Sequence, residues 1–159
     1  THEVIPMELV EKIKESATFH EGMQTLRQIS FGLLDMAWHG GNPSKIASVK
    51  EFEEKAFENT KLYPDTTQTC MSTSFSHIFQ GGYSAGYYSY KWAEVLAADA
   101  YDFVKESGGI GSKSAHHFRE CILEVGGSLD FMQQYIKFRG GKPKIEGLLK
   151  ASGIAVNHS

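Results

Sequence analysis

Apolar residues recur at helical spacing through almost the whole chain, and pairs of glycines interrupt this pattern. Side chains three and four positions apart share one face of a helix, so such repeats predict amphipathic helices. Glycine pairs end helices because glycine readily adopts left-handed backbone conformations. Four of the five pairs, at 40–41, 108–109, 126–127 and 140–141, each stand behind an apolar stripe. We therefore predict a single all-α domain over residues 1–159, with about six to seven helices.

The individual helices are expected where these stripes lie. Pro64 breaks the third helix, and from Thr66 to Gly82 the polar sequence has no period, so a short helix or a loop is expected there. The expected stripes are Leu9, Ile13 and Ala17; Met23, Leu26, Ser30, Leu33, Leu34 and Ala37; Phe52, Ala56 and Phe57 behind a capping box at Ser48–Glu51; Tyr88, Trp92, Val95 and Phe103 in a long helix over about 84–106; Ala115, Phe118, Ile122 and Val125; Leu129, Met132 and Ile136; and Ile145, Leu148 and Leu149 with Gly153 as cap.

Composition excludes several classes of function. Hydrophobic residues make up 41% and charged residues 22% of the chain, as in an ordinary globular protein. The net charge of -3 argues against nucleic acid as the main partner, because phosphate binding needs a basic surface. No apolar run approaches the roughly twenty residues of a membrane span, and no signal peptide is visible. Cys70 and Cys121 are expected to be reduced thiols of a cytoplasmic protein, with a single disulfide as the alternative.

Residues 75–92 form the irregular Gly/Tyr-rich segment of this helical pattern. From His77 to Trp92 the sequence places one histidine, three glycines and four tyrosines within sixteen positions. Glycines let the backbone bend closely around a ligand, and phenols and imidazole donate hydrogen bonds to developing negative charge. His77 precedes Tyr83 by six residues, across the pair Gly81-Gly82, so it can fold back toward the tyrosines. This combination indicates part of an active site that stabilises an oxyanion.

Two interpretations of the tyrosines stay open on spacing alone. Tyr83, Tyr87 and Tyr90 share one face if the helix begins near Tyr83. They would then be either an aromatic core stripe with hydroxyls at its rim, or a surface that faces a ligand. A core would have to supply three buried partners for three phenols, whereas Phe or Leu would need none. The neighbouring glycines favour the ligand-facing surface.

Other catalytic motifs are absent. His-Glu occurs at His2 and His20, but Pro6 and Gln24 stand four positions later, so neither forms the HExxH motif of zinc peptidases. His116 and Glu120 share a helix face, yet two ligands are too few for a closed metal site, and a solvated surface is expected. No phosphate-binding glycine loop and no Ser/His/Asp or Cys/His set is supported.

The chain resembles the zinc oligopeptidase family of thimet oligopeptidase, oligopeptidase A and peptidyl-dipeptidase. The resemblance covers essentially the whole chain and matches the C-terminal part of that family. It is carried by Phe75–Phe79, Gly81–Tyr83, Gly86–Tyr88, Tyr90–Trp92 and Glu94–Asp99, and outside this motif by Leu26–Gln28, Phe31–Asp35, Phe138–Gly140 and Lys142–Pro143.

The resemblance implies a fold and roles for particular residues. Family members are helical ellipsoids with a deep channel that admits short peptides, and an HExxH helix with a later glutamate holds the zinc ion that activates water. By position, His77, Tyr83 and Tyr90 match the groups thought to hold the substrate carbonyl and its oxyanion. Tyr87 matches a tyrosine that positions substrate, and Gly81-Gly82 a flexible loop.

The zinc-binding motif of the family lies N-terminal to the region that this chain matches. The chain begins at Thr1 without an initiator methionine, so we expect a C-terminal catalytic-domain fragment of a longer peptidase. Its partners would be short peptide substrates and the missing N-terminal part. The fragment alone is expected to bind no zinc and to be inactive. The alternative is a non-catalytic helical module that binds peptides or a partner domain, and an HExxH helix encoded upstream would distinguish the two.

Overall fold

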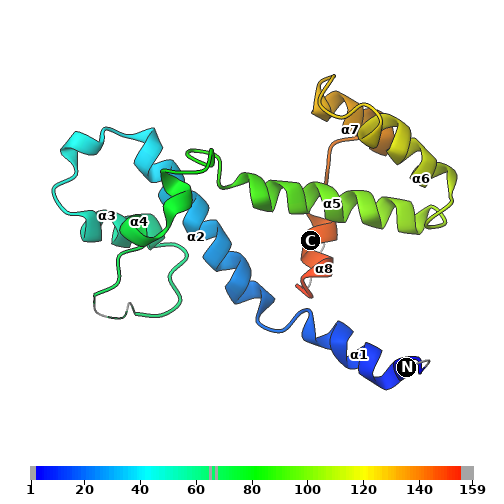
Figure 1. Ribbon diagram of the computed structural model, residues 1–159, viewed down its shortest axis with the longest axis horizontal. Coiled ribbons are helices and arrows are strands. Elements are labelled where there is room, and N and C mark those ends of the chain that lie inside the picture. The colour runs from blue at the N-terminus through cyan, green and yellow to red at the C-terminus, as the bar shows by residue number, and fades with distance from the viewer. Residues whose placement is uncertain (1–2, 65, 67, 155–159) are drawn as a thin grey trace, which may run out of the picture. The chain divides into compact units, whose positions relative to one another are not determined.

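The structure is a computed structural model that describes residues 3–64, 66 and 68–154. His2, named above for its His-Glu pair, and Asp65, which follows Pro64, lie outside these described residues; the third helix ends at Phe57, before Pro64. The chain forms two compact units, one up to Lys91 and one from Trp92 onward. Helices α1 to α4 belong to the first unit, and the long helix α5 leads into the second (Figure 1).

The first unit is assembled around helix α2. Its elements are α1 (Met7–Ser16), α2 (Glu21–Gly40), the 3-10 turn η1 (Pro43–Lys45), α3 (Val49–Phe57), α4 (Met71–Ser74) and the 3-10 turn η2 (Ser76–Ile78). Leu34 of α2 and Ile78 of η2 are fully buried, and both α3 and η2 pack on α2. The Trp38 ring lies 4.5 Å from Phe52 of α3, and its indole N–H donates to Ser72 Oγ of α4 at 2.8 Å. These contacts join α2, α3 and α4 into one body.

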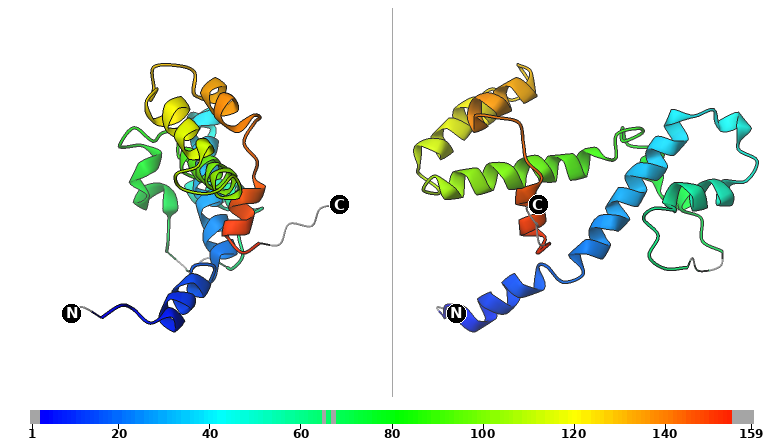
Figure 2. Two further views of the ribbon diagram at one scale, coloured as in Figure 1. Left: turned by 90° about the vertical axis from the view of Figure 1, so that its right-hand side faces the viewer. Right: turned by 180° about the vertical axis from the view of Figure 1, so that it is seen from behind.

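The second unit is built on helix α5 (Ser89–Glu106). It continues through α6 (Lys113–Phe118), the π-helical turn η3 (Arg119–Leu123), α7 (Phe131–Arg139) and α8 (Glu146–Ala151). The yellow α6–η3 segment and the orange α7 lie side by side in both views of Figure 2. Its core consists of Ala100, Cys121, Tyr135 and Phe138, with Leu96, Phe103, Val104, Phe118 and Ile122 packed against them.

Among the described residues every regular element is a helix, so the prediction of an all-α fold is confirmed. Helix ends fall at the predicted glycines: α2 ends at Gly40 and α7 is followed by Gly140 at φ +78°. Gly153 follows α8 at φ +69°, as predicted for its cap. Ser48 caps α3 by accepting a hydrogen bond from the Glu51 backbone N–H. Local residue types therefore determine where these helices begin and end.

Several predicted boundaries and faces were wrong. The long helix begins at Ser89 and not near Ser84, because tertiary hydrogen bonds hold the preceding residues in turns. In α7, Ile136 of the expected stripe is exposed, while Tyr135 and Phe138 are buried. In α3 the most buried side chain is Glu53, and no residue of α1 is buried. The apolar period predicted the helices correctly but not which face each one buries.

No helix in the described part of the chain is both long enough and apolar enough to cross a lipid bilayer.

Candidate functional site

Six aromatic rings gather in the first unit, next to helix α2, and we call them the aromatic cluster. The imidazole of His77 lies 5.1 Å from the Tyr83 ring and 5.7 Å from the Tyr87 ring, centroid to centroid. The cluster brings together all three sequence-predicted tyrosines and the histidine. Its members are Phe31, Phe75, His77, Tyr83, Tyr87 and Tyr90.

The chain reverses direction between His77 and Tyr83 at two positions whose backbone conformation only glycine adopts easily. Gly81 and Gly82 have φ angles of +77° and +78°, in the left-handed region. A Cβ atom on Gly81 would also lie 3.3 Å from the Tyr83 ring, which is tighter than an ordinary contact. The glycine pair thus lets the chain fold back and lets the Tyr83 ring lie against the turn. The prediction that His77 folds back toward the tyrosines is confirmed.

Tyr83 and Tyr90 form the accessible part of the cluster. Their rings stack at 5.5 Å, and they are 37% and 42% exposed. A side-chain hydrogen bond with Tyr83, together with burial and the neighbouring phenols, raises the pKa of Tyr90. The Tyr90 phenol therefore stays protonated well into the alkaline range, and only the protonated phenol donates a hydrogen bond. The cluster thus brings together three groups that are able to donate hydrogen bonds, the two phenols and the His77 imidazole.

Tyr87 differs from its neighbours because it points inward. It is 8% exposed, and its hydroxyl donates to Gln28 Oε1 of α2 at 2.7 Å. Burial raises the pKa of Tyr87, and the positive charge of Arg27 opposes this rise. The ring packs against Phe75 at 5.0 Å and Tyr90 at 5.2 Å. Tyr87 therefore supports the accessible phenol from beneath, and its own hydroxyl already has an acceptor.

Asp35 of α2 holds the turn between Tyr83 and the start of α5, a role that sequence reasoning missed. Its side chain is fully buried. Oδ1 accepts from the Ala85 backbone N–H at 2.9 Å, and Oδ2 accepts from the Tyr87 backbone N–H at 3.0 Å. His39 Nδ1 lies 3.0 Å from Oδ1. The available signal was a carboxylate directly after the apolar pair that ends at Leu34.

Glu53 of α3 is a second buried carboxylate that sequence reasoning missed. It accepts hydrogen bonds from the backbone N–H groups of Met71, at 3.1 Å, and Ser72. The Cys70 thiol also donates to it at 3.4 Å. Burial alone would raise the pKa of Glu53, but the bonds from Ser72, Met71 and Cys70 outweigh it and lower the pKa. Glu53 thereby satisfies the first N–H groups of α4, the short helix that precedes His77.

Residues discussed for metal or thiol chemistry lie apart from the cluster. Glu120 contacts His117 at 3.6 Å rather than His116, and both of these side chains are exposed. Cys70 and Cys121 are free thiols, so the alternative of a disulfide is not realised. Across residues 3–64, 66 and 68–154, no three His, Cys, Asp or Glu side chains are grouped so that they could hold a metal ion.

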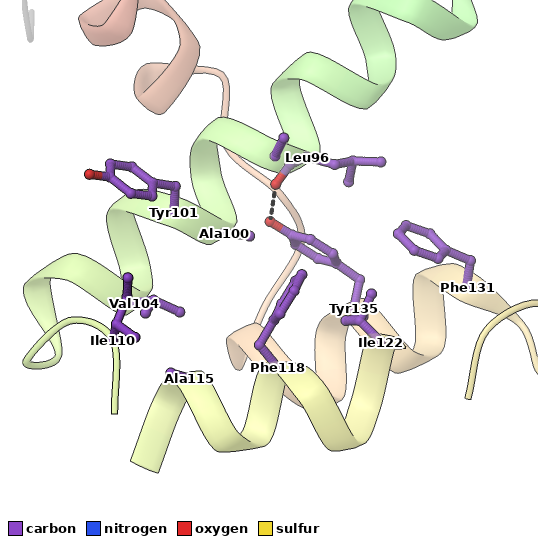
Figure 3. A pocket seen from close by; sticks show the side chains of 11 residues that line it. Leu96, Ala100, Tyr101, Val104, Ile110, Ala115, Phe118, Ile122, Phe131 and Tyr135 are labelled. Atoms are coloured by element: carbon purple, nitrogen blue, oxygen red, sulfur yellow. Dashed lines mark hydrogen bonds between the residues drawn. The ribbon is translucent and has the colours of Figure 1, made fainter. Parts of the chain in front are cut away.

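The second unit contains an apolar hollow of about 450 Å³ between α5, α6–η3 and α7 (Figure 3). Tyr135 lines it, but the Tyr135 hydroxyl donates to the Leu96 carbonyl at 3.2 Å and to Asp99 Oδ2 at 2.7 Å. Arg139 completes this buried group, with its Nε 3.2 Å from Asp99 Oδ2. The Tyr135 hydroxyl is thus already paired, and the lining of the hollow is mainly apolar.

The chain is similar along almost its whole length to known peptidases. The chain is 38% identical over 155 residues to oligopeptidase A of Salmonella typhimurium, covering 97% of this chain and 23% of the relative. It is 37% identical over 155 residues to dipeptidyl carboxypeptidase of Escherichia coli, with 96% and 23% covered. An organellar oligopeptidase A of Arabidopsis thaliana is 36% identical over 159 residues, with 97% and 20% covered.

The chain therefore spans about a quarter of the length of the curated relatives that it matches. The model of peptidase family M3 matches residues 1–154, which is nearly the whole chain. On this match and these identities, the chain belongs to peptidase family M3.

Proposed function

We propose that this chain is the C-terminal part of a zinc-dependent oligopeptidase and supplies donors to its oxyanion. His77, Tyr83 and Tyr90 would donate hydrogen bonds to the substrate carbonyl and to the tetrahedral oxygen that forms from it. The observation that carries the proposal is the stacking of the Tyr83 and Tyr90 rings at 5.5 Å, with the His77 imidazole 5.1 Å from Tyr83. Three donors of the right chemistry are thus gathered on an accessible surface.

Neutral phenols suit this task. Peptide hydrolysis places negative charge on the former carbonyl oxygen, and preorganised donors stabilise that charge more than they stabilise the uncharged substrate. The raised pKa of Tyr90 keeps its proton in place over the range in which peptidases work. The stacked rings hold the Tyr83 and Tyr90 side chains next to each other before a substrate binds.

We assign supporting roles to the other predicted residues. Gly81-Gly82 shapes the turn that carries Tyr83, which is how this pair contributes to substrate binding. Tyr87 positions the substrate indirectly, because its buried ring packs beneath Tyr90 and its hydroxyl is held by Gln28.

The substrates we propose are short peptides, which the names of the relatives, oligopeptidase A and dipeptidyl carboxypeptidase, support. The zinc ligands would lie in the remaining part of the longer protein, because the described residues of this chain do not form a zinc site. The isolated chain is then expected to bind no zinc and to hydrolyse nothing, and its partner is the rest of the same protein. A cytoplasmic location is supported by a relative named probable cytosolic oligopeptidase A.

Replacing Tyr90 by Phe in the full-length protein tests the proposal. The variant keeps the stacked ring but removes the donor, so kcat should fall by about two orders of magnitude while KM changes little. Tyr88→Phe is the matched control, because Tyr88 is 58% exposed and is not part of the aromatic cluster. Its kcat should equal that of the wild type. An unchanged kcat in Tyr90→Phe would exclude the proposed role.

A further inference from the structure

The turn from Tyr83 to Tyr88 is held in a conformation that its own sequence does not favour. Ala85 has φ +57°, a left-handed conformation that places its Cβ atom too close to the backbone. Within the turn, Gly86 N–H donates to the Tyr83 carbonyl at 2.8 Å, and Ser89 N–H donates to the Gly86 carbonyl at 3.0 Å. A contact from outside must therefore offset the strain at Ala85.

Asp35 supplies that contact. A buried carboxylate is costly unless hydrogen bonds replace the water it has lost. Both oxygens of Asp35 are used, one by the strained Ala85 N–H and the other by the Tyr87 N–H. The carboxylate thus holds the turn at two of its residues, Ala85 and Tyr87, and it belongs to α2, a helix of twenty residues. His39, on the next turn of α2, places its Nδ1 2.8 Å from the Asp35 backbone carbonyl and 3.0 Å from Oδ1 of the same carboxylate.

The turn that Asp35 holds lies between the two accessible phenols, those of Tyr83 and Tyr90. Tyr83 lies two positions before Ala85, and Tyr90 lies three positions after Tyr87. Their rings meet at 5.5 Å only if the backbone between them keeps this path. An asparagine at position 35 would present one oxygen and one NH2 group, so one of the two backbone N–H groups would face a donor where it now faces a carboxylate oxygen.

We infer that Asp35 is the positioning residue for the oxyanion donors: it fixes the turn that sets Tyr83 and Tyr90 at the separation that catalysis needs. This inference rests on the proposed function, and it assigns Asp35 no contact with substrate. It predicts that loss of the Asp35 carboxylate lowers kcat through the phenols and in no other way.

The test is a double-mutant cycle in the full-length protein. Asp35→Asn should lower kcat about 30-fold with KM within about twofold of the wild type, because a small misplacement of donors is costly in the transition state. In the Tyr90→Phe background the same change should lower kcat less than about threefold, since residues that act as a unit are not additive. If Asp35 had a merely structural role, Asp35→Asn would lower kcat by the same factor in the wild-type and Tyr90→Phe backgrounds.

Asp99→Asn is the matched control, because it removes another buried carboxylate, which lies in the second unit and contacts Tyr135 and Arg139. Any loss it causes should be the same in both Tyr90 backgrounds. Should Asp35→Asn fail to fold, His39→Phe replaces it in the cycle. That variant keeps the ring beside Phe79 but removes the nitrogen next to Asp35. It should lower kcat about threefold in the wild type and leave kcat unchanged in the Tyr90→Phe background.

The outcomes separate the two proposals. Suppose that Tyr90→Phe greatly lowers kcat, but that Asp35→Asn lowers kcat by the same factor in the wild-type and Tyr90→Phe backgrounds. That result overturns the positioning role and leaves the proposed function standing. An unaltered kcat in Asp35→Asn does the same. A Tyr90→Phe enzyme with wild-type kcat overturns the proposed function, and the positioning role falls with it.

Discussion

The Tyr87 hydroxyl donates a 2.7 Å hydrogen bond to the side-chain oxygen of Gln28, a residue 59 positions earlier in the chain. This bond distinguishes Tyr87 from Tyr83 and Tyr90, which present their rings at the surface. Three tyrosines that look equivalent in the sequence thus have two different roles. Two are accessible at the surface, whereas the third ties the turn before α5 to α2.

Tyr87→Phe is expected to act on stability more than on catalysis. The change leaves the Gln28 oxygen without its donor and should lower the free energy of unfolding by about 1 kcal/mol. It should lower kcat less than tenfold, against roughly a hundredfold for Tyr90→Phe. Urea denaturation and steady-state kinetics of the full-length protein measure the two effects. A loss of kcat equal to that of Tyr90→Phe would show that the Tyr87 hydroxyl reaches the substrate directly.

Alanine at Gly81 and at Gly82 should separate backbone strain from displacement of the Tyr83 ring. Both glycines have nearly the same positive φ, so each substitution should cost about 1–2 kcal/mol of stability. Only at Gly81 does the new Cβ atom meet the Tyr83 ring, at 3.3 Å, while Gly82 has nothing within 4 Å. Gly81→Ala should therefore lower kcat about tenfold more than Gly82→Ala. Equal kcat values for the two variants would contradict a role for the ring position.

Helix ends were predictable because their signals are local. Gly140 and Gly153 lie in left-handed conformations directly after helices, and Ser48 caps the residue three positions on. The approach of His77 to Tyr83 was predictable for the same reason, since the glycine pair between them requires a reversal. Nothing in the local sequence, however, indicates that Ala85 adopts φ +57°.

The start of α5 depends on a residue 50 positions away. Spacing alone predicts a helix from about residue 84, but the Asp35 carboxylate holds the Ala85 and Tyr87 N–H groups in turns. Glu53 similarly organises residues 18 and 19 positions later. Both carboxylates are buried, whereas an Asp or Glu on a helix is ordinarily expected to face solvent. The sequence pattern therefore identified residues that gather in the aromatic cluster, whereas the groups that hold them became visible only in three dimensions.

Glu53→Gln should weaken the first unit in a manner that depends on pH. The hydrogen bonds lower the pKa of Glu53 below its usual value of about 4.5, so the folded state favours the ionised form. This stabilisation is present above pH ~4.5 and is lost as pH falls through the folded-state pKa. At pH 7 the variant should lose about 1–3 kcal/mol of unfolding free energy, because glutamine presents only one oxygen to the donors. Denaturation curves at pH 7 and in the acid range measure the difference.

Glu54→Gln is the control for this effect, since Glu54 is the exposed neighbour of Glu53 on α3. It should leave stability within about 0.5 kcal/mol of the wild type at both pH values. If the deficit of Glu53→Gln stays constant from pH 7 into the acid range, the ionised Glu53 carboxylate is not the source of the stabilisation.

Tyr135→Phe should reveal an alkaline dependence of stability in the second unit. Burial, the hydrogen bond to Asp99 and the charge of Asp99 raise the pKa of Tyr135 well above its usual range, and Arg139 only partly opposes them. The folded state therefore keeps this proton more tightly than the unfolded state does. The stabilisation is complete below about pH 10, the ordinary tyrosine pKa, and falls as pH rises further.

Two differences between wild type and Tyr135→Phe are expected from this linkage. At pH 7 the variant should be less stable by about 1–2 kcal/mol, because Asp99 loses one of its donors. Above pH 10 this difference in unfolding free energy should narrow, by at most about 1.4 kcal/mol per pH unit. Only the wild type has the Tyr135 phenol, whose ionisation in the unfolded state then lowers the stability of the wild type. Tyr101→Phe, at a tyrosine that is 65% exposed, should follow the wild type throughout. A gap that stays constant between pH 9 and pH 11 in urea denaturation would contradict the raised pKa of Tyr135.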